Sequence, residues 1–382
     1  MKQICGKVYL IFLVLFSKFI YIFIRLFNLG SGYTLPGYLI LKLFPSIFNY
    51  LDKKFPKGVI VVTGTNGKTT TSKLVSYTLQ ESGFKVLHNH SGSNLLRGIL
   101  SVLLLCYFEN YDYAVFEVDE FSLSLVLKHV KPTHLIFLNL SRDQLDRYGE
   151  IDIILKKWIS SVKNLDSCAN VLIDSEASEF KKIPEIYKNV IYFQKRYDLL
   201  ETAFLEGGFN AQNIGASLEV VKTLNISEDK FIKILKSFGS AYGRGEKIKL
   251  NEYVFNIYLA KNPESFNQNL KMLNQSGNKF DAFLFILNDN LPDGRDVSWI
   301  YDIDPLLLEK VCAGKKILVS GRRYLDMAVR LKYAGIKAEK LDRNVSKLIS
   351  FIKKENSKNI CVLPNYSAML KVRKILTGKA IL

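Results

Sequence analysis

Apolar runs of four to eight residues recur along the first half of this chain, and polar turns separate them. Runs of this length suit strands better than helices, and a strand without polar positions is buried on both faces. Segments with helical spacing lie between several of the runs. The pattern therefore predicts an α/β fold with a mostly parallel sheet. The predicted strands are residues 59–62, 113–118, 133–140, 170–174 and 189–193.

A second set of strand candidates follows Ser240, beyond the turn Gly243–Gly245. These candidates are residues 283–287, 316–320 and 360–364. They predict a second, smaller α/β domain of the Rossmann type. We therefore divide the chain into an apolar N-terminal helical segment (1–45), a central domain (46–238) and a C-terminal domain (239–382).

The N-terminal segment is apolar from Val8 to Ile24, except for Ser17 and Lys18. This run is shorter than the roughly 20 apolar residues that cross a bilayer. On a helix, Lys7, Lys18 and Arg25 would share one narrow face. We predict a helix that lies in the plane of a membrane interface, with its cations at the lipid phosphates. Packing of the same helix against the protein's own core is the alternative.

Composition narrows the choice of partners. Lys and Arg number 53 against 36 Asp and Glu, which gives a formal net charge of +17, and 48% of the residues are hydrophobic. The charge suits nucleotides, anionic lipids or a pyrophosphate-bearing substrate, although a lysine-rich background would give the same excess. No motif that reads RNA or DNA accompanies it, so we expect no nucleic-acid partner.

The five cysteines include no C-x-x-C pair and have no histidine cluster beside them. We therefore expect neither a structural zinc site nor a disulfide framework, which fits a reducing cytoplasm. The cysteines are Cys5, Cys106, Cys168, Cys312 and Cys361.

The sequence TGTNGKTT, at residues 63–70, joins the first predicted strand to a helix. Glycines there let backbone N–H groups approach oxyanions, Lys68 adds a positive charge, and the hydroxyl of Thr69 can bind a Mg²⁺ ion that bridges nucleotide phosphates. We therefore expect ATP as the ligand. The residues expected to contact it in this loop are Gly64, Thr65, Asn66, Gly67, Lys68, Thr69 and Thr70.

Only two residues separate the first glycine from the Gly-Lys pair, which is shorter than the usual P-loop spacing. This short loop resembles that of the Mur ligase family, whose members join a carboxylate to an amine through an acyl phosphate. The resemblance implies a catalytic role for Lys68. It also implies that Glu117, at the end of the strand YAVFE, holds Mg²⁺ together with Thr69. Asp119 and Glu120 are alternative ligands.

Two further segments resemble the same family. LNLSRDQLDRYGE matches it at Asn139, Asp143, Asp146 and Arg147, but Gln144 replaces a metal-binding histidine, which puts a second metal site in doubt.

The other segment is GGFNAQNIGAS, in which Asn210 and Asn213 correspond to nucleotide-contacting positions. An asparagine amide both donates to and accepts from a base edge, although Asn210 would also suit a helix N-cap.

The closing third of the chain resembles the MurT family through AKNPESFNQNL, LNDNLPDGRDVSWIYDID and SGRRYLDMAVRLKYAG. That resemblance implies ATP-dependent amidation of the D-glutamate α-carboxylate of lipid II, with ammonia from a GatD-type glutamine amidotransferase partner. The chain itself has no Cys-His arrangement typical of a glutaminase. With the cysteine pattern and the N-terminal helix, this function predicts a cytoplasmic enzyme that is peripheral at the inner face of the cell membrane. Family members commonly carry a four-cysteine zinc ribbon, which residues 174–207 lack.

In the MurT family, an aspartate of the C-terminal domain is thought to orient the partner's catalytic histidine. Asp293 and Asp296 are the candidates here, and a turn role for either is the alternative. Two other functions stay open at this point. One is another Mur-type amide ligase, such as an amino-acid-adding enzyme like folylpolyglutamate synthase, and the other is a noncatalytic nucleotide-binding regulatory subunit.

Overall fold

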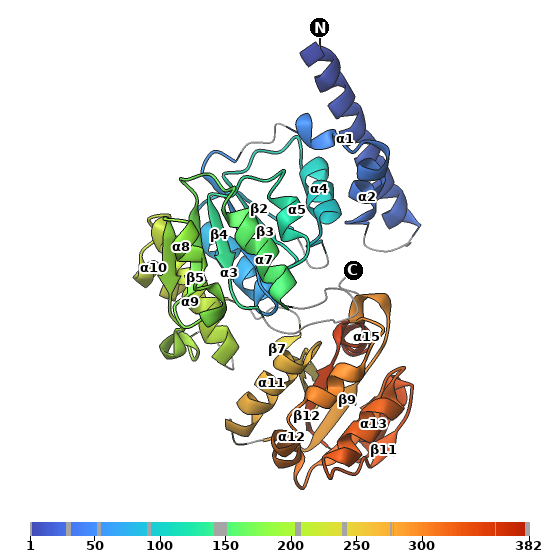
Figure 1. Ribbon diagram of the computed structural model, residues 1–382. Helices are drawn as coiled ribbons and strands as arrows, with labels where there is room; N and C mark the ends of the chain where they lie inside the picture. Colours follow the sequence, from blue (N-terminus) through green and yellow to red (C-terminus); the bar gives the residue numbers. More distant parts are fainter. Residues whose placement is uncertain are drawn as a thin grey trace.

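The structure is a computed structural model with two lobes, each built around a six-stranded sheet (Figure 1). We call these sheet A and sheet B. The structure describes residues 2–27, 32–51, 55–89, 93–140, 151–202, 208–238, 243–275, 277, 279–355 and 357–378.

Sheet A is parallel throughout, with strand order β2-β3-β1-β4-β5-β6. Its central strand β1 pairs Val62 with Glu117 and Thr63 with Phe137. The segments that follow three neighbouring strands therefore meet at one edge of the sheet. The strands are β1 (Gly58–Thr63), β2 (Val86–His88), β3 (Tyr113–Glu117), β4 (His134–Phe137), β5 (Asn170–Asp174) and β6 (Val190–Phe193).

Helices cover both faces of sheet A, because alternate residues of β1 enter different cores. Ile60 and Val62 pack with α3 (Lys68–Glu81), α9 (Gly208–Thr223) and α10 (Glu228–Leu235), whereas Val61 packs on the opposite face. The opposite face is covered by α4 (Leu96–Leu105), α5 (Leu123–Val126), α7 (Ile151–Val162) and α8 (Ile183–Ile186). Two short 3₁₀ helices, η2 (Ser178–Phe180) and η3 (Tyr197–Leu199), lie in the connections.

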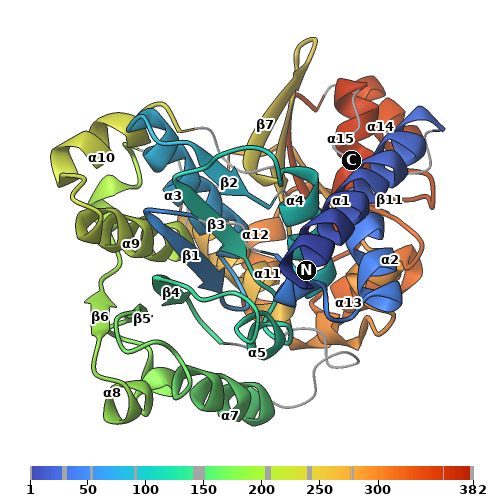
Figure 2. The same cartoon turned by 90° about the horizontal axis from the view of Figure 1, so that it is seen from above.

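The N-terminal helices pack against the outside of α4 (Figures 1 and 2). They are α1 (Lys2–Leu26), α2 (Leu35–Leu43) and the 3₁₀ helix η1 (Ile47–Asn49). Gly37 brings α2 close to α4, since its backbone N–H donates to Ser101 Oγ at 2.7 Å. A Cβ on Gly37 would lie 1.9 Å from the carbonyl oxygen of Arg97, so a larger residue would push the two helices apart.

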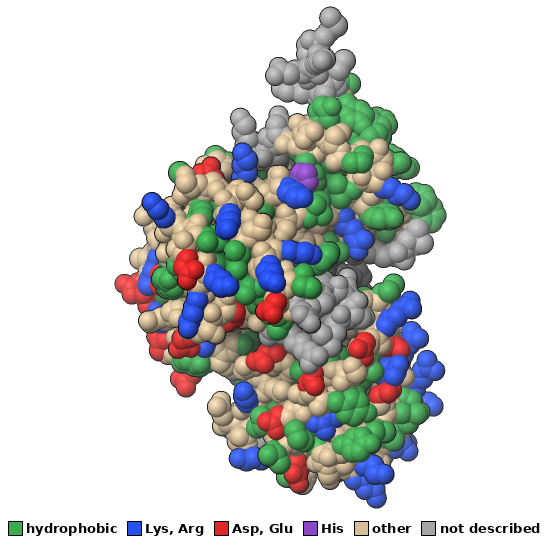
Figure 3. All heavy atoms as spheres, viewed as in Figure 1, with side chains coloured by type: hydrophobic (Ala, Val, Ile, Leu, Met, Phe, Trp, Pro, Cys, Tyr) green, Lys and Arg blue, Asp and Glu red, His purple; other side chains and the backbone are tan. Residues whose placement is uncertain are grey.

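Helix α1 has two apolar faces that point in opposite directions. On one face, Leu10, Leu13 and Val14 share a core with α2 and α4, and Ser17 and Ile24 are also buried. The other is exposed and consists of Val8, Ile11, Phe12, Leu15, Phe19, Ile22, Phe23 and Leu26; it forms part of the hydrophobic surface at the upper right of Figure 3. The stretch Val8–Leu26 is long and apolar enough to cross a membrane by length and composition. The expectation that this run is too short is therefore wrong.

Sheet B has strand order β11-β10-β9-β12-β8-β7 and is parallel except for the β7–β8 hairpin. Its strands are β7 (Arg244–Leu250), β8 (Tyr253–Tyr258), β9 (Ala282–Ile286), β10 (Lys316–Ser320), β11 (Lys340–Leu341) and β12 (Asn359–Pro364). One face packs with α11 (Pro263–Gln275), α12 (Pro305–Cys312) and α13 (Tyr324–Tyr333), the other with α14 (Val345–Lys354) and α15 (Tyr366–Thr377). Two 3₁₀ helices, η4 (Leu291–Asp293) and η5 (Ser298–Asp302), follow β9.

The predicted fold class is confirmed, and all eight predicted strands coincide with observed ones. The hairpin β7–β8 was not predicted, because Glu246, Lys247 and Lys249 interrupt the apolar pattern of the edge strand β7. The short strands β2 and β11 were also missed. The predicted domain boundary at residues 238 and 239 adjoins residues 239–242, which lie outside the described part of the chain.

Candidate active site

The loop between β1 and α3 takes a backbone shape that only glycine adopts easily. Gly64 has φ 140° and Gly67 has φ 89°. A Cβ on Gly64 would lie 2.9 Å from Leu138 Cβ, and one on Gly67 would lie 2.1 Å from Asn213 Oδ1. Both glycines are therefore required by close packing as well as by backbone conformation. The loop ends at the N-terminus of α3, where helix geometry directs N–H groups outward toward an anion.

Lys68 is buried at the base of this loop and is held in place by three acceptors. Its Nζ donates to the carbonyl oxygen of Gly64, to that of Thr65 at 3.1 Å and to Glu120 Oε2 at 2.9 Å. The Lys68 and Glu120 side chains are only 7% and 3% exposed. Trp158 Nε1 donates to the backbone oxygen of Glu120 at 2.9 Å and fixes the carboxylate's own segment. A preorganised positive charge thus lies beside the helix N-terminus.

Asn139, directly after β4, holds the other side of the loop. Its Oδ1 accepts from the N–H of Asn66 at 2.9 Å, and its backbone oxygen accepts from the N–H of Thr65 at 2.9 Å. Gln212 Oε1 accepts from Asn139 Nδ2 at 2.8 Å, and Gln212 Nε2 donates to Asp174 Oδ2 at 2.6 Å. The N–H groups of Thr65 and Asn66 are therefore used inside the protein. The N–H groups that could contact a phosphate are therefore those of the later part of the loop and of the first turn of α3.

Glu117 ends β3 beside the phosphate loop and is buried, with 6% exposure. Asn89 clamps its backbone through two hydrogen bonds of 2.8 Å, one to the N–H and one to the oxygen. Asn94 Nδ2 lies 3.5 Å from Glu117 Oε1. The neighbouring Asp119 accepts from the N–H of Phe121 at 3.1 Å and so shapes the turn after the strand.

Thr69 and Glu117 offer a donor set that fits a hard cation. Thr69 is half-buried at the second position of α3, and the carboxylate of Glu117 lies at the adjacent strand end. Mg²⁺ in nucleotide sites usually binds one or two protein oxygens and takes its other ligands from water and phosphates. Within the described residues, no group of three or more His, Cys, Asp or Glu side chains could hold an ion by itself.

Asn210 and Asn213 lie in the first turns of α9, beneath the loop, and each is only 1% exposed. Asn213 Oδ1 accepts from Thr71 Oγ1 at 3.2 Å, and Asn213 Nδ2 donates to Asn210 Oδ1 at 3.2 Å. These amides connect α9 to α3 and support the loop. Contact of either residue with a nucleotide base stays a prediction. Thr70, which was expected to contact the nucleotide, is also buried.

The carboxyl-end edges of sheets A and B face each other. Asn262, which follows β8, has its Nδ2 3.5 Å from Oδ1 of Asn66 in the phosphate loop. Tyr366, which follows β12, has a raised pKa because it is partly buried and because the charges of Glu117 and Asp293 lie near it. A ligand on the phosphate loop would therefore adjoin the C-terminal domain.

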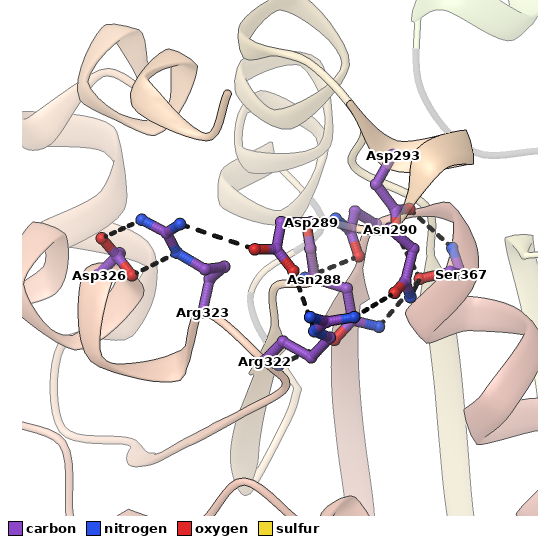
Figure 4. A network of polar contacts seen from close by, with 9 residues as sticks. Asn288, Asp289, Asn290, Asp293, Arg322, Arg323, Asp326 and Ser367 are labelled. Carbon is purple, nitrogen blue, oxygen red and sulfur yellow. Dashed lines mark hydrogen bonds and ion pairs between the residues drawn. The ribbon is translucent and has the colours of Figure 1, made fainter. Parts of the chain in front are cut away.

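The two candidate aspartates of the C-terminal domain have different surroundings. Asp293 is 4% exposed and accepts both from the N–H of Ser367 at 2.8 Å and from its hydroxyl (Figure 4). Burial raises the pKa of Asp293. Asp296 is exposed and accepts from the N–H of Ser298 at 2.8 Å, and hydrogen bonds from Ser298 lower its pKa. Of the two, Asp296 presents an ionised carboxylate at the surface.

Sequence reasoning missed several residues that build this site. Asn89 and Gln212 were not singled out, because an amide that bridges backbone groups carries no motif. Glu120 was considered only as a metal ligand, whereas it pairs with Lys68. The run of acidic residues after β3, directly beside a loop lysine, was the available signal for that pairing.

Four residues that were compared with the Mur ligase family in sequence lie outside the described part of the chain. They are Asp143, Gln144, Asp146 and Arg147, within residues 141–150.

Two family models match this chain. The Mur ligase middle domain matches residues 62–234, and the MurT ligase C-terminal domain matches residues 259–369. The first match covers the phosphate loop and Glu117, and the second covers both candidate aspartates.

Relatives and solved structures agree with these matches. A lipid II isoglutaminyl synthase (glutamine-hydrolyzing) subunit MurT from Staphylococcus aureus (strain COL) is 29% identical, over 88% of this chain and 91% of the relative. The protein of the same name from Streptococcus pneumoniae (strain ATCC BAA-255 / R6) is 27% identical, over 93% and 94%. The MurF ligase of Thermotoga maritima in complex with ADP has the same fold, with TM-score 0.67, 17% identity and coverage of 88% and 82%.

Proposed function

Because this chain belongs to the Mur ligase family, in its MurT branch, we propose that it is the ligase subunit of a lipid II isoglutaminyl synthase. It would amidate the α-carboxylate of D-glutamate in lipid II to give D-isoglutamine, at the expense of ATP. One observation carries this proposal. The phosphate loop, Glu117 and the edge of the MurT-type domain meet at one place.

The reaction needs ATP because oxide is too poor a leaving group for ammonia to displace from a carboxylate. In the first step, a carboxylate oxygen attacks the γ-phosphorus of ATP, the bond to the β-phosphate oxygen breaks, and ADP leaves. In the second step, ammonia attacks the acyl carbon of the acyl phosphate, phosphate leaves with the bonding electrons, and the nitrogen loses a proton. Positioning and electrostatic stabilisation supply most of the acceleration in such transfers.

Lys68 would stabilise the negative charge that develops on the transferred phosphoryl group. Its ammonium is held beside the loop by Glu120 and by backbone oxygens, so its charge is in place before the phosphoryl group is transferred. The N–H groups of the later part of the loop and of the first turn of α3 would orient the phosphates. Asn210 and Asn213 would contact the adenosine moiety through α9.

Glu117 and Thr69 would hold Mg²⁺, which neutralises phosphate charge when it is bound. Asn89 keeps Glu117 in place through the backbone of β3, so the carboxylate is aimed before any ion arrives.

Ammonia would come from a GatD-type glutamine amidotransferase subunit. In that complex, Asp296 is better suited than Asp293 to orient a histidine of the partner, since it is exposed and its pKa is lowered. Asp293 is engaged by Ser367 and would instead shape the loop after β9.

Reconstitution tests the function directly. The chain, its amidotransferase partner, Mg²⁺, ATP, glutamine and lipid II should together release ADP, and mass spectrometry should detect conversion of one carboxyl to an amide. Without lipid II, ADP release should stop. When lipid II is present but an amino acid replaces glutamine, amidation should not occur. ADP release that depends on an added amino acid would instead identify another Mur-type amide ligase. No ADP release above background would contradict a catalytic role.

We also propose that the exposed face of α1 binds the membrane interface, at the cytoplasmic side where lipid II is made. The buried face of α1 packs in the protein's own core. On the opposite face, Phe12 and Phe19 are 61% and 63% exposed. Lys18 and Arg25 lie on the flank between the two faces, where cations can reach lipid phosphates. The sequence offered membrane contact and packing against the protein's own core as alternatives. In this proposal each of them uses a different face of the same helix.

Liposome flotation tests this contact. The variant Phe12→Glu/Phe19→Glu should lose most of its binding to vesicles that contain anionic lipid. Leu306→Glu/Leu325→Glu is the matched control, since these side chains are 75% and 57% exposed in the C-terminal domain and the charge change is the same. Equal flotation of both variants and the parent chain would contradict the proposal.

A further inference from the structure

A small pocket lies at the carboxyl-end edge of sheet B, separate from the phosphate loop. Its volume is about 70 Å³, and it lies between the end of β10, the start of α14 and α15. This is more room than one water needs and far less than a nucleotide fills. Its charged lining residues are Arg322, Arg343 and Lys371, and no carboxylate lines it.

Ser320, the last residue of β10, supplies a polar group inside the pocket. Its side chain is fully buried, and within the described part of the chain its Oγ has no hydrogen-bond partner. A buried hydroxyl without a partner is unfavourable, so a ligand or a water in the pocket that accepts from Ser320 Oγ would be stabilised.

The surrounding backbone is fixed by contacts that only a small residue permits. Gly321 has φ 101°, and a Cβ there would lie 2.2 Å from the carbonyl oxygen of Leu287. The N–H of Arg322 donates to Asn288 Oδ1 at 2.9 Å, which ties the loop after β10 to the loop after β9. The pocket wall is therefore preorganised and does not depend on a mobile side chain.

The three cations differ in how they are held. Arg322 Nε lies 3.1 Å from Asp289 Oδ1, and its NH1 donates to Asn290 Oδ1 at 3.0 Å (Figure 4). Arg343 and Lys371 are exposed, and neither has an ion-pair partner among the described residues. One guanidinium is thus fixed, while two unneutralised cations remain at the rim. The start of α14 adds the positive end of a helix dipole.

We propose that this pocket binds a tetrahedral oxyanion, namely a phosphate or the terminal group of a diphosphate. Ser320 would donate its hydroxyl to the anion, and Arg343 and Lys371 would neutralise its charge. The site lies outside the residues proposed to bind ATP, so it stands independently of the ligase reaction.

Titration calorimetry of the full chain with inorganic phosphate tests this site, with saturating Mg²⁺ and a nonhydrolysable ATP analogue occupying the phosphate loop. We expect one phosphate per chain. Arg343→Glu/Lys371→Glu should weaken binding about tenfold or more, and Ser320→Ala about fivefold. Ser320→Ala should fold with unchanged Tm, since it removes a hydroxyl that has no partner in the free protein.

The matched control is Lys353→Glu/Lys354→Glu, which makes the same charge change at the opposite end of α14. Its affinity should stay within about twofold of the parent's. No phosphate binding, equal losses in control and pocket variants, or unchanged affinity in both pocket variants would overturn the proposal.

Competitors separate the possible sources of the anion. Pyrophosphate that binds more tightly than phosphate would assign the pocket to a substrate diphosphate, whereas equal affinity would assign it to free phosphate. Acetate that competes as well as phosphate would overturn a preference for tetrahedral oxyanions.

Discussion

The carboxyl-end edges of the two sheets share a topology but are built differently. At the edge of sheet A, glycines bring the backbone close to its neighbours, and the buried pair Lys68–Glu120 carries the charge. At the edge of sheet B, amide and hydroxyl side chains such as Asn288 and Ser367 join the loops, and the cations remain exposed. In a buried ion pair, losing one partner leaves the other uncompensated. The first edge should therefore be the more sensitive to single substitutions.

Lys68→Ala tests the sensitive edge most severely. It should lower kcat about 10³-fold, because the charge that faces the transferred phosphoryl group is lost. It should also lower the free energy of unfolding by about 3 kcal/mol, because Glu120 stays buried without the ammonium. ADP-release kinetics and chemical denaturation measure the two effects.

The control for that substitution is Lys85→Ala, which removes an exposed lysine just before β2. It should leave both quantities nearly unchanged. Retention of more than a tenth of the parent's kcat by Lys68→Ala would contradict the catalytic role of this lysine.

Asp296→Asn and Asp293→Asn compare an exposed with a buried carboxylate at the edge of sheet B. With the amidotransferase partner and glutamine as nitrogen source, Asp296→Asn should lower amidation about 10²-fold, because an amide no longer orients the partner's imidazole. Free ammonia should restore its rate, since the phosphate site is untouched. Asp293→Asn should keep glutamine use but lose stability through its contact with Ser367. Full glutamine use by Asp296→Asn would remove that residue from the reaction.

The difference between the two edges also explains what the sequence could predict. The phosphate loop was predictable because glycine and lysine at fixed spacing have few other uses, whereas Glu117 was singled out through the resemblance of its segment to the Mur ligase family. The clamps Asn89 and Gln212 were not, since each works through tertiary contacts with distant backbone groups. Most strands buried on both faces were predictable from their apolar runs, whereas the apolar strand β8 and the charged edge strand β7 were missed.

Gly67→Ala measures how closely the loop at sheet A is packed. The new Cβ would lie 2.1 Å from Asn213 Oδ1 at φ 89°, so the loop must shift. We expect the Kd for ATP to rise about tenfold, which corresponds to about 1.4 kcal/mol. Gly83→Ala is the matched control, because Gly83 has φ 92° but no heavy atom within 4 Å of the added Cβ.

Both glycine variants should lose about 1 kcal/mol of stability from the left-handed backbone alone. Only Gly67→Ala should bind ATP more weakly. Equal ATP affinity in the two variants would mean that the loop tolerates a side chain. The carboxyl-end edge of sheet A would then be less sensitive to substitution than the comparison with sheet B predicts.

The opposite, amino-terminal edge of sheet A can be tested without a ligand. His134, at the start of β4, is buried, and burial lowers its pKa from the usual 6.5 to about 4. Between these values the unfolded chain binds a proton that the folded chain does not. The stability contribution of neutral His134 is therefore complete above pH 6.5 and is lost at about 1.4 kcal/mol per pH unit as the pH falls toward 4.

His134→Gln should remove that slope from the pH dependence of urea unfolding. His134 shares a hydrogen bond with Thr223 that glutamine would not reproduce in the same geometry, so we expect some loss of stability at neutral pH. His129→Gln is the comparison, since His129 is exposed and lies on the same half of the chain. Desolvation of part of its ring and the charge of Lys128 also lower its pKa, but its exposure to solvent limits the effect, so its removal should change the slope less. An unchanged slope in His134→Gln would show that other groups govern acid sensitivity, and that the buried imidazole at the amino-terminal edge contributes none of it.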